Sequence, residues 1–241
     1  MVRYGARHVN FLSHDRLLGE GVPALAHVGA ALPDLWPLLA VRPLPLVVLR
    51  RLRASGERDA ATLAYGIAHH MHADAAFHGH HVFEARMANA ARRLRSHLDT
   101  LRHPGLAAHV LVEMLLDRWL IDRDPQLVDA YYDHFSDAGR RRACDLSSEE
   151  PGVRDDLAGV LDRFTVSRFL ADYATFEGIA LRLVRTLRRV GVLGEDEIDL
   201  AALAAEVGAL RDELESGSEA LLEDVAARVE ASLVDAGIAP P

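Results

Sequence analysis

Apolar residues recur every three or four positions through most of the chain, which is the period of helices with one face in a core. No segment alternates apolar and polar residues as a half-buried strand does. The sequence therefore predicts an all-α fold built as a single helical-bundle domain. The helical segments that we expect after residue 58 are 59–97, as one helix or two with interruptions at Gly66 and Gly79, then 106–121, 125–143, 153–165 and 167–190.

The first 50 residues follow a different pattern, because glycine and proline interrupt them eight times between residues 19 and 45. Both residue types break regular structure, so we expect loops and short helices there. Further along, Gly139 precedes three arginines, which is typical of the C-terminal end of a helix, and residues 146–152 have the composition of a loop.

The last part of the chain is acidic. Leucines and valines step by three and four on both sides of Ser216-Gly217-Ser218, which predicts a helical hairpin. Residues 195–236 hold thirteen acidic residues and two arginines. We expect a main domain over 1–193 and a hairpin over 194–241 that packs on it. The alternatives are a dimerisation element, which would make the protein a homodimer, and a cover for the active site.

Composition excludes several classes of function. All 27 basic residues are arginine, so neither a P-loop lysine nor a lysine Schiff base is available. Outside the acidic segment the net charge is close to zero, which does not indicate nucleic-acid binding. Cys144 is the one cysteine, so no disulfide within the chain and no thiolate metal cage can form. The start lacks the apolar core of a signal peptide and no apolar run is long enough for a membrane span, so we expect a soluble, cytoplasmic protein.

Two helical segments carry columns of metal-binding residue types. One column is His70, Asp74 and His78, and the other is His109, Glu113 and Asp117. Residues four apart lie one turn apart on the same face of a helix. We therefore expect each helix to present three ligands on one face.

The second column lies in the strongly apolar sequence HVLVEMLLDRWL, so we expect Glu113 to be buried. A buried, isolated carboxylate is costly, and a bound metal ion removes that cost. The ends of each column are about 12 Å apart at ~1.5 Å per residue, too far to share one ion. We therefore expect two ions, with His70–Asp74 and His109–Glu113 as the primary pairs. His78 and Asp117 would serve the second ion or support the first ligands.

The remaining candidates are less regular. His69, His72, His80 and His81 crowd the first column, and we interpret them as surface or rim residues. His14 and Asp34 are candidates in the N-terminal part. Asp34 follows Pro33, and taken alone it suits an Asx turn or a helix N-cap in a loop.

Four motifs in order resemble the acyl carrier protein phosphodiesterases, a family of helical, metal-dependent enzymes related to the HD phosphohydrolases. The motifs are NFLSH at 10–14, GAALPD at 29–34, GIAHHMHAD at 66–74 and EMLLD at 113–117. The resemblance implies an HD-like fold and an acyl carrier protein as the phosphoester substrate. It also implies that the metal site comprises His14, Asp34, His70, Asp74, Glu113 and Asp117. Arg118 stands where that family has a histidine.

The chain is also similar to the zinc-dependent phospholipases C, in which a His-xxx-Asp helix and a His-xxx-Glu helix hold the metals. Both resemblances imply hydrolysis of a phosphoric ester by a metal-activated water. Asp74, His78 and Arg118 are the residues that we expect to take part in catalysis, with Arg118 binding phosphate. The mixed ligands suit zinc, manganese or iron. A non-catalytic metal-binding helical protein is the remaining alternative.

Overall fold

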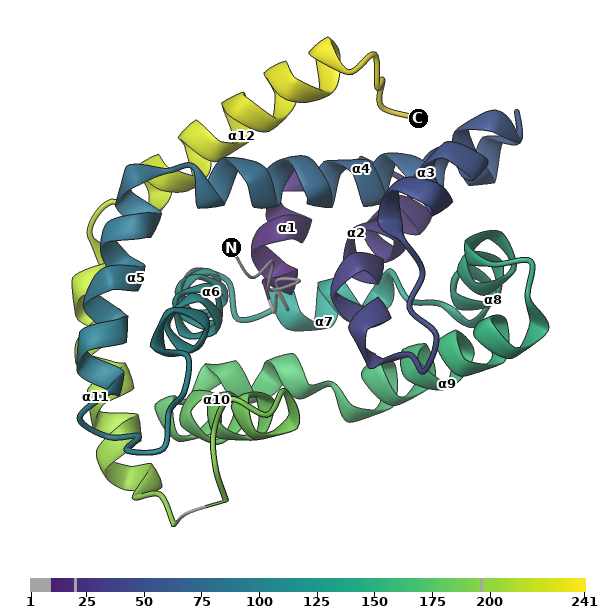
Figure 1. The fold of residues 1–241 in the computed structure, drawn as a ribbon. Helices are drawn as coiled ribbons and strands as arrows, with labels where there is room; N and C mark the ends of the chain where they lie inside the picture. The colour runs from purple at the N-terminus through teal and green to yellow at the C-terminus, as the bar shows by residue number, and fades with distance from the viewer. Residues whose placement is uncertain (1–9, 20, 196) are drawn as a thin grey trace. The chain divides into compact units, whose positions relative to one another are not determined.

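The computed structural model describes residues 10–19, 21–195 and 197–241. Over these residues the chain forms twelve α-helices and two short 3-10 helices, and no strand (Figure 1). The prediction of an all-α fold is therefore confirmed. Within the described part of the chain, no helix is both long enough and apolar enough to cross a membrane.

The helices fall into two compact units, each made from separate stretches of the chain. The first unit includes His78–Pro125 and Phe169–Leu222, and the second comprises Phe11–Phe77, Gln126–Arg168 and Glu223–Pro241. These units group segments by mutual contact, and they do not test the expected division at residue 193. That division stays a prediction.

The second unit contains the N-terminal helices and a later group. Most of α4 belongs to this unit, while its last residue, His78, belongs to the first. Figure 1 shows α8 and α9 as consecutive helices joined by a short loop. The helices of this unit are α1 (Phe11–Leu18), α2 (Ala24–Leu35), the 3-10 helix η1 (Trp36–Leu38), α3 (Pro45–Ala54), α4 (Arg58–His78), α7 (Leu127–Asp133), α8 (Asp137–Ser147), α9 (Pro151–Ser167) and most of α12 (Ser218–Asp235).

The first unit is organised around a buried helix, α6. Every residue of α6 from Ala107 to Asp117 is buried, because other helices of this unit pack on several of its sides. The expectation that Glu113 is buried is therefore confirmed. The helices of this unit are α5 (His81–Leu94), α6 (Pro104–Arg123), the 3-10 helix η2 (Phe169–Ala174), α10 (Phe176–Arg189) and α11 (Leu200–Glu215).

Part of the acidic C-terminal segment is neutralised inside the first unit, which contains α11, while most of α12 belongs to the second unit. That the two helices form a hairpin stays a prediction. The guanidinium of Arg93 on α5 forms ion pairs with Glu206 and Glu213 of α11. Arg86, also on α5, donates to the carbonyl oxygens of Leu214 and Ser216 at the end of that helix. Two acidic residues of α11, Glu206 and Glu213, are thus neutralised by an arginine of α5.

Several expectations about helix ends are wrong. The segment 167–190 is not one helix, because the 3-10 helix η2 ends at Ala174 and Thr175 begins α10 by accepting a hydrogen bond from the backbone N–H of Gly178. The segment 125–143 is not one helix, because α7 ends at Asp133 and Ser136 begins α8 by accepting a hydrogen bond from the backbone N–H of Gly139. Gly139 therefore lies near the start of a helix rather than at its end. Gly66 does not interrupt α4, whereas the break expected at Gly79 separates α4 from α5.

Gly66, through which α4 continues without a break, allows close packing against α2. A β-carbon at Gly66 would lie 1.9 Å from the carbonyl oxygen of Ala26, and one at Gly29 would lie 2.5 Å from that of Leu63. Real β-carbons do not approach backbone atoms this closely. The missing side chains let the backbones of α2 and α4 touch, and this contact lies one turn or slightly more before Asp34 and His70.

Candidate metal centre

The first ligand comes from α1. Phe11, His14 and Leu18 are spaced by three and four, so they share one face of the helix, and all three are buried. The apolar ends of this face anchor α1 in the second unit and hold the imidazole between them. His14 is 2% exposed.

Three further ligands come from α2 and α4. His70 and Asp74 lie one turn apart on α4, as the sequence predicted, while Asp34 lies in the last turn of α2. The interpretation of Asp34 as a loop or N-cap residue is wrong, since α2 continues past Pro33 as far as Leu35. The close contact of α2 with α4 brings its carboxylate to His70.

The distances among these side chains match ligands around one ion. His14 Nε2 is 3.2 Å from Asp74 Oδ1, and His70 Nε2 is 3.4 Å from Asp74 Oδ2 and 3.6 Å from Asp34 Oδ1. Two of these exceed the usual range of an N–H···O hydrogen bond, which ends near ~3.2 Å. They agree with the edge of a tetrahedron of ligands with bonds of about 2.0–2.2 Å, an edge of roughly 3.3–3.6 Å. His14, His70 and Asp74 offer ligand atoms that all lie within 4.8 Å of one another. Asp34 is not part of that group and is joined to it by its contact with His70. We call the four side chains cluster 1.

The burial of cluster 1 adds an electrostatic argument. Three of its side chains are at most 2% exposed, and that of Asp74 is 18% exposed. The carboxylates of Asp34 and Asp74 both contact the imidazole of His70, and two negative charges held around one side chain in a poorly solvated place repel each other. A divalent cation would remove that repulsion, and the more exposed Asp74 leaves one side of the cluster accessible. The donor set of imidazole and carboxylate suits zinc, manganese or iron.

The neighbouring His69 is buried as well, so its interpretation as a rim residue is wrong. Burial, followed by the proximity of His14 and His70, lowers the pKa of His69 from 6.5 to about 3. This imidazole is therefore neutral near pH 7 and brings no further positive charge to cluster 1. His80 is also buried, and it caps α5 by accepting from the backbone N–H of Val82.

A second group of ligands, cluster 2, lies in the first unit and consists of His78, His109 and Glu113. The rings of His78 and His109 are perpendicular, with centroids 4.7 Å apart. His109 Nε2 is 2.8 Å from Glu113 Oε1, a distance at which the two form a direct hydrogen bond. The predicted column of His70, Asp74 and His78 is therefore split between two clusters. His70 and Asp74 belong to cluster 1, and His78 belongs to cluster 2 with His109 and Glu113 of α6.

Two predicted site residues lie outside these clusters. Asp117 is fully buried in α6 and belongs to no group of three metal-binding side chains among the described residues. Arg118 donates to Asp122 Oδ1 at 2.7 Å and to the carbonyl oxygen of Tyr173, and it lies over the ring of Phe176. These contacts hold Arg118 within the first unit, and its role in binding phosphate stays a prediction.

Sequence reasoning missed a third group, Asp15, His27 and His134 in the second unit. His27 Nδ1 is 2.6 Å from Asp15 Oδ1, and the rings of His27 and His134 stack at 3.8 Å. A hydrogen bond and a ring stack account for these contacts without an ion. The three residues come from separate elements, so no spacing along the chain could have indicated the group.

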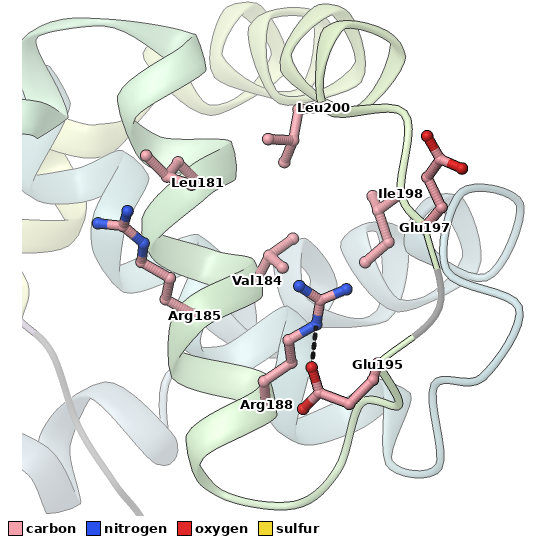
Figure 2. Close-up of a pocket in the computed structure, with 8 residues that line it drawn as sticks. All are labelled: Leu181, Val184, Arg185, Arg188, Glu195, Glu197, Ile198 and Leu200. Carbon is pink, nitrogen blue, oxygen red and sulfur yellow. Dashed lines mark ion pairs between the residues drawn. The ribbon is translucent and has the colours of Figure 1, made fainter.

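A pocket in the first unit contains none of the predicted site residues. Figure 2 shows the aliphatic side chains of Leu181 and Val184 on α10 facing Ile198 and Leu200, with an ion pair of 3.9 Å between Arg188 and Glu195 at one side. Its walls thus offer apolar surface, one ion pair and the further charges of Arg185 and Glu197, but no side chain that the sequence indicated for catalysis.

No protein-family model, curated protein or solved structure matches the chain. The resemblance to acyl carrier protein phosphodiesterases therefore rests on the four motifs alone.

Proposed function

We propose that the protein is a metal-dependent phosphodiesterase whose essential ion is held by cluster 1. The observation that carries the proposal is the separation of 3.2–3.6 Å between imidazole nitrogens and carboxylate oxygens in a buried place. The order of the motifs that contain these four residues supports the reaction class.

A divalent ion held there would lower the pKa of a coordinated water toward ~7 and polarise a phosphoryl oxygen. Around it, the residues of the chain have separate tasks. His14, Asp34 and His70 are buried and fix the site, since their side chains come from three packed helices. Asp74 is partly exposed, so its carboxylate is the group placed to orient a water or accept its proton.

Cluster 2 supports the expectation of a second ion, because its own side chains form a suitable set of ligands. Its His2Glu donor set is that of many catalytic zinc sites. Whether its ion would act with that of cluster 1 stays a prediction, since the two clusters belong to different units. Zinc, manganese and iron are the ions that we propose for both.

The first test is metal content together with hydrolysis. Purified protein should contain at least about one transition metal ion per chain and hydrolyse bis-p-nitrophenyl phosphate. The variants Asp74→Ala and Asp34→Asn should lose the ion and reduce kcat/KM more than ~100-fold, the upper end of the effect of outer-shell partners. Asp155→Asn is the matched control, because Asp155 is an exposed carboxylate of the same unit.

The possible results distinguish three alternatives to the proposal: no metal site, a structural metal site without catalysis, and catalysis at another place in the protein. Protein without bound metal, after purification free of chelators and reconstitution with each ion, would refute the proposal. Metal that is lost from Asp34→Asn, without hydrolysis by the unmodified protein, would assign a structural site and no catalysis. Full activity of the folded Asp74→Ala variant would show that the reaction occurs elsewhere.

A further inference from the structure

Aliphatic side chains are exposed in one short stretch of the second unit. Among the described residues, eight large hydrophobic side chains are exposed, and five of them lie between residues 38 and 47. These five are 41–68% exposed, so they project into solvent rather than packing on the core. They are Leu38, Val41, Leu44, Leu46 and Val47.

The same stretch carries unpaired positive charge. Residues 35–56 contain four arginines and no acidic residue, although the whole chain has a net charge of −9. Arg42, Arg50 and Arg53 are exposed, and none of them forms an ion pair with a described residue. The acid that does contact this stretch, Asp156, accepts a hydrogen bond from the backbone N–H of Ala40. We call the five aliphatic side chains and these three arginines the apolar–arginine face.

The side chains that attach α3 to the rest of the unit are not part of the apolar–arginine face. On α3, Val48 and Leu52 are one turn apart and buried, so they anchor the helix to the unit. Leu46 and Val47 point elsewhere, and Leu44 stands between Pro43 and Pro45 just before the helix. Because proline fixes its own backbone angle and restricts the residue before it, Leu44 is held in place at little further entropic cost.

We propose that the apolar–arginine face docks the protein on an anionic lipid surface. Aliphatic side chains enter the boundary between headgroups and acyl chains, while neighbouring arginines pair with lipid phosphates. A protein partner is the less suitable occupant, because protein interfaces are enriched in aromatic residues and methionine, and the exposed apolar residues here are leucine and valine alone. This inference does not depend on the metal centre.

The test is sedimentation of the full chain with large vesicles. Vesicles of phosphatidylcholine with about one third phosphatidylglycerol should bind the protein at low salt, and pure phosphatidylcholine should bind it at least ~10-fold more weakly. Binding should fall at about 0.5 M NaCl, where charges are screened beyond ~4 Å. The double variant Leu44→Asp, Leu46→Asp should lose binding, whereas Val166→Asp is its control, since Val166 is 85% exposed outside the face.

A second pair of variants tests the charges. Arg42→Glu and Arg50→Glu should each weaken binding about fivefold or more, and Arg163→Glu, an exposed arginine elsewhere in the unit, should not. Circular dichroism checks that each variant is folded.

Two results would overturn the proposal. One is the absence of binding to anionic vesicles at low salt, or equal binding by the double variant. The other is a dimer of the unmodified protein in light scattering that dissociates in the double variant while vesicle binding is absent, which would assign the face to a second copy of the chain.

Discussion

Asp74 is the residue on which the geometry of cluster 1 converges. Its two carboxylate oxygens face the Nε2 atoms of His14 and His70, one each. Those histidines are 56 positions apart in the sequence and come from different helices, α1 and α4. The spacing of His70 and Asp74 was predictable, because it is local, whereas the approach of His14 was implied by the family resemblance alone.

Cys144 gives a prediction at the same scale. Its side chain is buried in α8, and burial, followed by Asp145 and Asp162, raises the pKa of the thiol to about 11. At pH 8 only about one molecule in a thousand carries the reactive thiolate. The native protein should therefore react with a chromogenic disulfide reagent at least ~100-fold more slowly than the protein unfolded in guanidinium chloride. Complete labelling of the native protein at the unfolded rate would contradict this.

Among the elements, the contact of α2 with α4 decides whether cluster 1 can form. Gly66→Ala would place a methyl group against the carbonyl oxygen of Ala26, and overpacking of this kind costs about 1–3 kcal/mol. The cost should lie at the upper end of that range, because the β-carbon would meet backbone atoms, which cannot rotate away as a side chain can. The gain in helix propensity, about 1 kcal/mol, therefore offsets only part of it. Urea unfolding should show a lower free energy of unfolding for Gly66→Ala, and the variant should bind less metal.

Gly152→Ala is the control for that substitution. Gly152 lies within α9, and a β-carbon there has no other atom within 4 Å. This change should stabilise the protein slightly. If both alanine variants were equally stable and equally metallated, the two helices would not depend on their glycines.

The metal should also be visible in the stability of the whole molecule. The cluster 1 ligands come from three helices, so an ion binds them together only in the folded state. At a free concentration one hundred times its Kd, such an ion adds about 2.7 kcal/mol to the free energy of unfolding. For a chain of this size that corresponds to a rise in Tm of about 5–10 °C. Calorimetry before and after removal of metal with a chelator checks this, and an unchanged Tm would contradict it.

Over the whole chain, the sequence predicted what depends on neighbours in sequence. The helical period, the buried α6 with Glu113 and the C-terminal pair of helices around Gly217 all follow from local spacing. What depends on distant contacts was missed or misjudged. The group of Asp15, His27 and His134 spans three elements, and His69 was expected at a rim because no local pattern shows which face of a helix a fold covers.

Because eleven consecutive residues of α6 are buried, this helix should tolerate insertions and deletions poorly. Adding or deleting a single residue inside a helix turns everything beyond it by about 100°. On a helix with one face in solvent, side chains displaced by such a change can point into solvent, and a few residues at the helix end can unwind to restore the register. No such face exists between Ala107 and Asp117, so an inserted residue would place mismatched side chains against the neighbouring helices. An insertion between His109 and Glu113 would also separate these two side chains, which now lie one turn apart.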